Sequence, residues 1–283
     1  MDRRLRKALL ALAALAFAPA AGAAEEPLWE AGFGVAALHF PDYRGSSRSR
    51  TYALPAPYFV YRGDFFKADR YGMRGIFFKT ERLDLNLSFG ASLPVDSADD
   101  PARAGMPDLE PSVEIGPSLD VTLWRSADHD TRVDLRTPLR AAISVESNPR
   151  YIGAQFYPHL NLDIAGPFGM SGWNLGLQGG PVFTNARYNR YYYAVEPQYA
   201  TASRPAYDPG GGYAGMQFLA ALSKRFPKYW VGGFVRYDTL AGAEFAGSPL
   251  VTSKRYLAGG FGISWIFAES STRVAAPDVG KAR

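Results

Sequence analysis

Short segments of alternating apolar and polar residues restrict the fold of this chain more than any other feature. The clearest segment runs from Arg82 to Leu93, where every second residue from Leu83 onward is apolar and the residues between are polar or glycine. Successive side chains of a strand point to opposite faces, so this period describes a two-faced β-strand, whereas a helix would mix the two sets. Segments of about ten residues with this pattern, separated by turns, are typical of transmembrane β-barrels.

The same period of two recurs along most of the chain. We predict strands at residues 28–40, 53–62, 64–69, 72–79, 82–93, 113–123, 133–145, 152–164, 172–184, 212–225, 228–239 and 255–267. This count requires residues 64–80 to form a hairpin that turns near Gly72, because one long strand there would leave an odd number, which bacterial single-chain barrels avoid. The predicted fold is therefore all-β, a transmembrane antiparallel β-barrel of about 12 strands, with ten as the alternative.

The N-terminus reads as a cleaved signal peptide over residues 1–23. Four basic residues precede an apolar run over residues 8–18, and Ala21-Gly22-Ala23 offers small residues for cleavage. The apolar run is shorter than the roughly 20 residues that a membrane-spanning helix needs. We therefore expect three parts: the signal peptide, an outer-membrane barrel over residues 24–267, and a flexible periplasmic tail over residues 268–283, which has no period-two run.

Charge and cysteine content exclude several classes of function. The chain carries 31 Lys and Arg against 27 Asp and Glu, and most of the excess lies in the signal peptide. No basic run remains to bind nucleic acid. The chain has no cysteine and three dispersed histidines, so neither a disulfide scaffold nor a metal site is expected. No cofactor is expected either.

Aromatic residues gather at the predicted strand ends. If the short turns near residues 126–130, 166–171 and 226–227 are periplasmic, all five tryptophans lie at periplasmic strand ends, as an aromatic girdle at one membrane interface requires. These are Trp29, Trp124, Trp173, Trp230 and Trp265.

The polar faces of neighbouring strands predict charge pairs inside the barrel. A hairpin turning at residues 126–130 would bring Asp120 close to Arg136, with Glu114 and Arg140 further along the same strands. We expect these pairs to brace the wall and to fill part of the lumen of a barrel of intermediate size. A wide diffusion pore is not expected.

Catalysis has one candidate centre in the predicted interior. His159 lies beside Asn161 and Asp163, whereas His39 and His129 fall in rim or turn segments. A Ser–His pair could hydrolyse lipids, but such a polar row is also what any barrel lumen presents. We therefore predict a protein that is not an enzyme.

The long segment over residues 185–211 contains six tyrosines and three arginines. Tyrosine and arginine are common in recognition surfaces, so the segment could bind a ligand or partner. The other interpretation is a loop that folds over the barrel mouth. Both remain open at this point.

The last predicted strand ends in a recognisable pattern. Gly262, Trp265 and Phe267 resemble the C-terminal signal that the barrel insertion machinery reads in bacterial outer-membrane proteins. Other blocks resemble the MipA/OmpV family of outer-membrane proteins: residues 40–46, 54–58, 61–64, 103–109, 114–117, 237–242 and 248–250. These blocks follow one another in order along nearly the whole mature chain.

The resemblance implies a location and a range of roles. The location is the outer membrane of a Gram-negative bacterium, in contact with its lipid. One role is a scaffold that joins a murein lytic transglycosylase to a murein synthase. The alternatives are a narrow porin-like pore or a surface adhesin or ligand-binding barrel, and, more remotely, a barrel lipid hydrolase.

Overall fold

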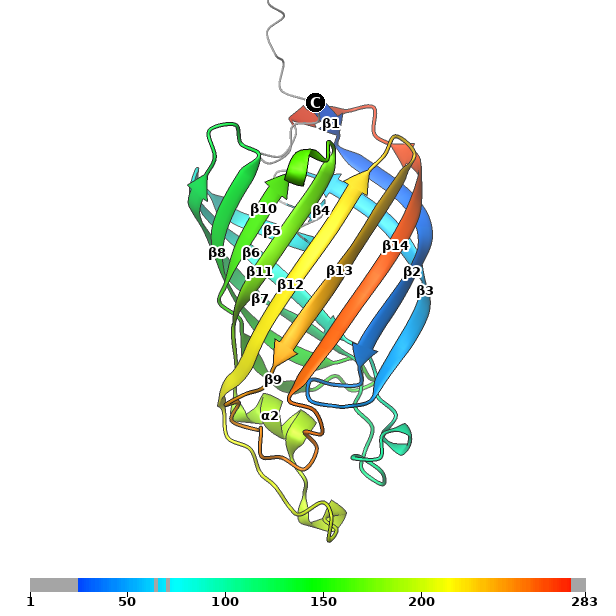
Figure 1. The fold of residues 1–283 in the computed structure, drawn as a ribbon, viewed down its shortest axis with the longest axis vertical. Coiled ribbons are helices and arrows are strands. Elements are labelled where there is room, and N and C mark those ends of the chain that lie inside the picture. Colours follow the sequence, from blue (N-terminus) through cyan, green and yellow to red (C-terminus); the bar gives the residue numbers. More distant parts are fainter. Residues whose placement is uncertain (1–24, 64–65, 70–71, 276–283) are drawn as a thin grey trace, which may run out of the picture.

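The computed structural model describes residues 25–63, 66–69 and 72–275 and shows one large antiparallel sheet that closes into a barrel (Figure 1). Each strand pairs with its neighbours in chain order, and β14 pairs with β2 to complete the ring. The wall strands are β2 (Trp29–Pro41), β3 (Ser49–Arg62), β4 (Phe66–Asp69), β5 (Gly72–Lys79), β6 (Leu83–Ser92), β7 (Ser112–Arg125), β8 (Thr131–Ser144), β9 (Tyr151–Phe156), β10 (His159–Ala165), β11 (Trp173–Thr184), β12 (Gly212–Arg225), β13 (Tyr229–Thr239) and β14 (Arg255–Glu269).

The predicted number of strands across the wall is confirmed. β9 and β10 both pair with β8 on one side and with β11 on the other, so they are two halves of one strand position. The break falls at Tyr157 and Pro158, where proline has no N–H to donate to the ladder. Counting this position once gives the 12 strands of the barrel.

The alternation read from the sequence separates the outside from the inside of the wall. In β14, Phe261, Trp265 and Phe267 are 58%, 60% and 68% exposed, whereas Ala258, Ser264 and Ile266 are buried. In β6, Leu83, Leu85 and Phe89 are exposed, whereas Asn86 is buried. The outer surface is therefore an apolar band, as a lipid-facing wall requires.

The two ends of the barrel differ. Turns at residues 80–82, 126–130, 166–172 and 226–228 lie at one end, which we call the short-turn end, together with the N-terminal strand β1 (Glu25–Pro27) (Figure 1). The long connections over residues 93–111, 185–211 and 240–254 lie at the opposite, long-loop end. By the general rule for these barrels, the short turns face the periplasm and the long loops face outward.

The segment after Phe267 corrects one expectation. β14 continues to Glu269, with a register shift between Ile266 and Ala268, and β15 (Arg273–Ala275) pairs with β1 in a separate two-stranded sheet. The expected free tail is therefore wrong for residues 268–275, because their backbone finds partners at the short-turn end. Residues 276–283 and the predicted signal peptide lie outside the described part of the chain.

The cluster of buried apolar side chains lies at the long-loop end of the barrel. Helix α2 (Ala186–Tyr193) begins at Asn185, whose side chain accepts a hydrogen bond from the Tyr188 amide. It packs on β9, where a Cβ on Gly153 would lie 2.5 Å from the Tyr188 Cα, so only glycine permits this approach. Tyr188, Tyr192 and Tyr193 are buried against the loop residues Leu240 and Phe245. The loop over residues 185–211 therefore covers the barrel mouth.

Among the described residues, no helix is long and apolar enough to cross a membrane.

Candidate functional site

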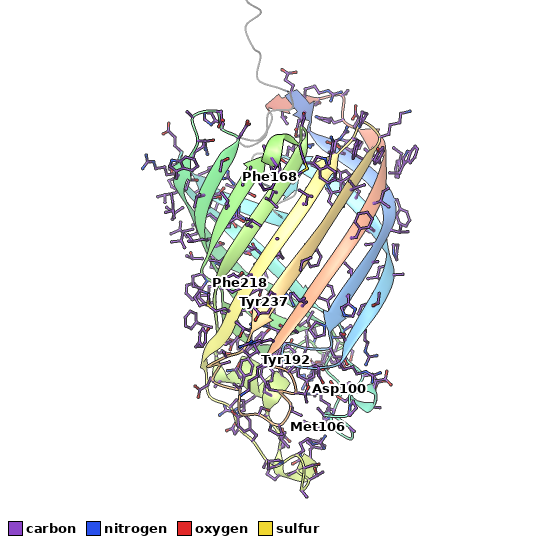
Figure 2. All side chains as sticks on the ribbon, viewed as in Figure 1. Asp100, Met106, Phe168, Tyr192, Phe218 and Tyr237 are labelled. Carbon is purple, nitrogen blue, oxygen red and sulfur yellow. The ribbon has the colours of Figure 1, made fainter. Side chains whose placement is uncertain are left out.

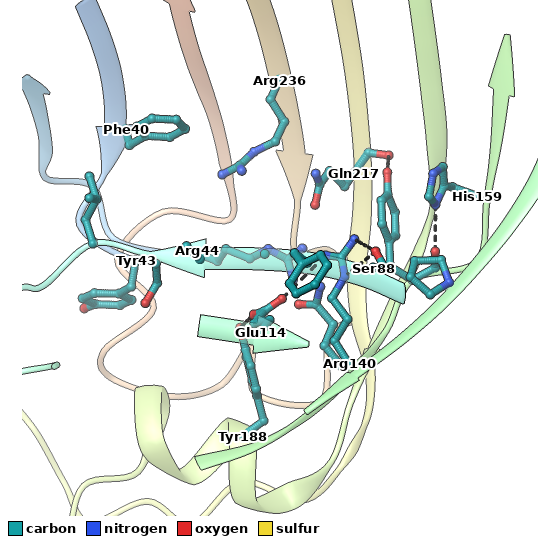
Figure 3. Close-up of a pocket in the computed structure, with 18 of the residues that line it drawn as sticks. Phe40, Tyr43, Arg44, Ser88, Glu114, Arg140, His159, Tyr188, Gln217 and Arg236 are labelled. Carbon is teal, nitrogen blue, oxygen red and sulfur yellow. Dashed lines mark hydrogen bonds and ion pairs between the residues drawn. The ribbon is translucent and has the colours of Figure 1, made fainter. Parts of the chain in front are cut away.

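A cavity of about 480 Å³ lies inside the barrel, next to α2 at the long-loop end (Figure 3). Its lining comes from nearly every side of the wall and from the long loops. The basic residues that line it are Arg44, Arg136, Arg140 and Arg236. The aromatic residues that line it include Phe40, Tyr43, Tyr157, Tyr188, Tyr192 and Tyr193. Amides, hydroxyls and three carboxylates add polar groups, and Phe89, Ala91, Leu93 and two prolines add apolar ones, so the lining is mixed.

The structure brings the four predicted lumen charges together in the two expected pairs. Arg136 Nε lies 3.8 Å from Asp120 Oδ2, and Arg140 Nη1 lies 3.7 Å from Glu114 Oε2. Arg140 also donates through Nη2 to Ser88 Oγ at 2.7 Å, which ties β8 to β6 across β7. These contacts place all four side chains in the wall of the cavity.

A second layer of charges lies on the short-turn side of the cavity and was not predicted from the sequence. Arg136 Nη2 is 3.4 Å from Asp134 and 3.3 Å from Asp163, and Arg132 Nε is 2.9 Å from Asp134. Asn161 donates to Asp163 at 2.7 Å. The polar positions were visible in the alternation of these strands, but their grouping depends on how β8 and β10 register.

Glu30 and Asp238 are two further buried carboxylates that sequence reasoning missed. Glu30 accepts from Arg62 Nη2 at 2.8 Å and Arg225 Nε at 2.9 Å near the short-turn end. Asp238 is fully buried at the long-loop end and receives Arg44 Nε at 3.1 Å and Arg236 Nε at 2.8 Å. Each carboxylate joins strands or loops far apart in the chain, so no short sequence pattern could have identified the pair.

The tyrosines of α2 form a cover over the long-loop side of the cavity. Tyr188 donates to Glu114 at 3.2 Å, and Tyr193 donates to the Arg44 carbonyl oxygen at 2.8 Å. Burial raises the pKa of Tyr188 and Tyr193 well above the ordinary value, and burial next to Tyr192 raises the pKa of Tyr191 to about 12. The hydroxyls therefore act as neutral donors at physiological pH.

Four of the five predicted girdle tryptophans face outward near the short-turn end. Trp124 and Trp265 are strongly exposed, Trp29 lies on the face opposite buried Glu30, and Trp173 lies beneath Lys224 Nζ at 5.9 Å. Trp230 is different. Its ring lies 6.1 Å from that of Tyr58, which is hydrogen-bonded to buried Glu30, so Trp230 points into the barrel and its assignment to an outward girdle is wrong. The reason is parity, since Tyr229 and Val231 occupy the outer face of β13.

The predicted assembly residues lie on β14, where it closes the ring with β2. Trp265 and Phe267 project from the outer wall, and Gly262 is directly opposite Ala36 on β2. The register shift near Phe267 is the one irregularity in this closing ladder.

The catalytic candidate His159 is engaged in the barrel wall. Its Nδ1 lies 2.8 Å from the Tyr157 carbonyl oxygen and its ring stacks on that of Tyr157, with centroids 4.3 Å apart. Two buried serines of the wall donate to carboxylates, Ser118 to Asp120 and Ser144 to Glu146. Across the described residues, no group of three or more His, Asp or Glu residues is arranged to hold a metal ion.

Comparison with known proteins decides the family. The family model described as MltA-interacting protein MipA matches residues 33–267. This chain belongs to the MipA family. The resemblance read from the sequence blocks is thereby confirmed, and the match covers the wall from β2 to β14.

A curated relative of this MipA-family chain is an outer-membrane protein. It is 24% identical over 201 residues to outer membrane protein OmpV of Vibrio cholerae serotype O1, covering 69% of this chain and 71% of that protein. Among solved structures, it is similar to the crystal structure of an outer membrane channel from Pseudomonas putida F1, with a TM-score of 0.43 and 12% identity over 87% of this chain and 98% of that chain. The protein is an outer-membrane β-barrel of the MipA/OmpV type in a Gram-negative envelope.

Proposed function

We propose that this barrel is a scaffold whose short-turn end holds a murein lytic transglycosylase, with a murein synthase as a further partner of the same assembly. The observation that carries the proposal is Phe168, in the turn between β10 and β11. Its side chain is 93% exposed and its backbone is left-handed, with φ 55° and ψ 28°. An exposed aromatic ring at the end that faces the periplasm is the kind of anchor on which protein interfaces depend.

The turn that presents Phe168 is rigid. Gly166 donates to the Trp173 carbonyl oxygen at 2.8 Å, Met170 donates to that of Pro167 at 3.0 Å, and Lys224 Nζ donates to that of Ser171 at 2.8 Å. A left-handed backbone costs a bulky L-residue roughly 1–2 kcal/mol. Strain of this kind at an exposed position supports a role in binding rather than in folding.

The partner class follows from the family, whose description names an MltA-interacting protein. The short-turn end offers more surface than the turns alone, because the β1–β15 ribbon extends it (Figure 1). A wide diffusion pore receives no support, since α2 covers one end and the Asp134 and Glu30 networks occupy the interior.

Site-directed cross-linking tests this role. The natural chain has no cysteine, so Phe168→Cys can carry a benzophenone at a single site in intact envelopes. Met106→Cys, in a loop at the opposite end, is the matched control (Figure 2). We expect the Phe168 probe to capture a murein transglycosylase and the Met106 probe to capture none.

A second variant separates contact from folding. Phe168→Gly removes the ring and relieves the left-handed strain, so the barrel should be at least as heat-stable while binding of the purified transglycosylase falls. Equal binding by the variant would remove Phe168 from the interface, and no capture by the natural chain would overturn the scaffold itself.

A further inference from the structure

The barrel wall is incomplete between β3 and β6. The hairpin of β4 and β5 fills this interval only near the short-turn end. β3 pairs with β4 at Tyr61 and Arg62, and the β5–β6 pairing that lies furthest toward the long-loop end is Gly75 with Leu87. Between the hairpin and the long-loop end, the facing edges of residues 49–60 and 88–92 have no ladder partner among the described residues. At the hairpin, β3 and β6 are three strand spacings apart, about 14 Å.

The sequence of β3 suits a free edge. The Arg62 amide donates to the Leu28 carbonyl oxygen, and the β2–β3 register is uninterrupted, so even-numbered residues of β3 donate to β2 and odd-numbered ones face the gap. Pro55 and Pro57 are both odd-numbered. Proline has no N–H, so two donors that would otherwise face lipid without a partner are absent.

The gap is framed on all sides. The β4–β5 hairpin bounds it toward the short-turn end. Toward the long-loop end, Arg50 Nη1 lies 3.0 Å from Asp99 and Ser46 donates to Asp100 at 3.1 Å, which joins the start of β3 to the loop after β6. We call this opening, between residues 53–59 of β3 and residues 89–93 at the end of β6 and just after it, the lateral window.

The interior cavity reaches the window. Phe89 and Ala91 of β6, and Leu93 just after it, are exposed on the outward face, yet they line the same cavity as the inward-facing Arg140 and Gln217. A cavity lined by residues from both faces of one strand passes around its edge. The outer part of the window is apolar on both sides, because β3 presents Ala53, two prolines and Phe59 there.

The inner end of the cavity carries unbalanced positive charge. Arg44 and Arg236 share one carboxylate, Asp238, whereas the carboxylates that line the cavity, Asp42, Glu114 and Asp120, form ion pairs with other arginines. Arg44 Nη2 is buried and has no hydrogen-bond partner in the described part of the chain. A buried donor left without a partner is destabilising, and an anionic oxygen placed beside it would accept its hydrogen bond. Figure 3 shows Arg44 and Arg236 at the cavity with Phe40.

We propose that the lateral window admits a single-chain amphiphile with an anionic head group from the outer leaflet into this cavity. Its acyl chain lies in the window between Phe89 and the prolines of β3, and its head group binds Arg44 and Arg236. A single chain fits because the cavity of about 480 Å³ is at the small end for ligand sites. The charge layer formed by Arg136, Asp134 and Asp163 bounds the site on its short-turn side.

Photolabelling with a palmitic acid analogue that carries a diazirine in its chain tests the proposal on the full protein in phosphatidylcholine vesicles. We expect label on peptides containing residues 53–59 and 89–93. Ala91→Trp, at the window edge, should abolish this label, whereas Ala220→Trp, on the outer face of fully paired β12, should leave it unchanged. Uniform labelling around the wall, or labelling insensitive to Ala91→Trp, would show ordinary annular lipid and overturn the proposal.

Head-group recognition is tested separately. Arg44→Gln should weaken binding of the acid at least about tenfold, since a charged hydrogen bond is lost, whereas Arg190→Gln in the exposed loop should not. The uncharged hexadecanol should bind the natural chain as weakly as the acid binds Arg44→Gln. If phosphatidylglycerol displaces the probe better than palmitic acid does, the single-chain ligand class is wrong. All readouts are independent of transglycosylase binding.

Discussion

The ring of Tyr193 lies flat against the ring of Phe245, with centroids 3.7 Å apart and planes within 5° of parallel. Tyr193 ends α2, and Phe245 lies in the connection between β13 and β14. Both side chains are almost fully buried. This stack joins two long loops above the cavity and holds the cover in place.

Removing one ring of this stack should release the cover. Phe245→Ala deletes a buried aromatic side chain, which costs about 3–5 kcal/mol, and that loss falls on the loops rather than on the wall. We expect faster proteolysis within residues 185–211 and a higher single-channel conductance, while the heat-shifted gel mobility of the barrel remains. Gln198→Ala, at an exposed position in the same loop, serves as the control. Unchanged proteolysis in Phe245→Ala would show that the stack does not hold the cover.

Asp238 should stabilise the folded barrel far more than a surface carboxylate does. Asp238→Asn leaves Arg44 and Arg236 without their shared counter-charge, and breaking a buried ion pair costs about 3–5 kcal/mol. We expect a clearly lower unfolding temperature on gels of samples heated in steps. Asp208→Asn removes the partner of Arg190 at an exposed site, where ion pairs contribute little. Equal shifts in the two variants would contradict this ranking.

Alkaline pH should loosen the cover. Burial raises the pKa of Tyr191 to about 12 and raises those of Tyr188 and Tyr193 well above the value of about 10 for an unfolded chain. Because the folded-state pKa values are the higher ones, the stability that these groups contribute is complete below pH 10 and is lost as the pH rises through 12. Ultraviolet absorbance should therefore show a group of tyrosines that ionise late, accompanied by faster proteolysis of the loop. Titration of all tyrosines together near pH 10 would be the contrary result.

Two truncations test how the last strand directs assembly. A chain ending at Phe267 keeps Gly262, Trp265 and Phe267 but loses β15 and the hydrogen bond from the Ser270 amide to the Trp29 carbonyl oxygen. We expect it to assemble with reduced heat stability. A chain ending at Ser264 lacks both outward aromatic rings at the interface and should remain unassembled.

Surface labelling and gel mobility before and after boiling distinguish these truncated forms. A chain ending at Ala275, which retains the ribbon, is the matched control. If the chain ending at Phe267 fails as completely as the one ending at Ser264, the assembly signal does not lie in these three residues.

The sequence by itself determined the wall of this protein. A side-chain period of two is a local property of the backbone, so the alternation in β6 and β14 was sufficient to predict strands, their two faces and a lipid-facing band. The pairing of Asp120 with Arg136 and of Glu114 with Arg140 also followed, because one short hairpin sets that register.

Tertiary structure decided what is enclosed by the wall and where the wall is open. Asp238 receives arginines from a distant loop and from its own strand, Trp230 faces inward through the parity of β13, and α2 reaches the mouth because Gly153 lets it approach β9. The prolines of β3 could be read as unusual for a strand, but their meaning depends on the shortness of the neighbouring hairpin. Such relationships join segments far apart in the chain, and only the closed barrel brings those segments into contact.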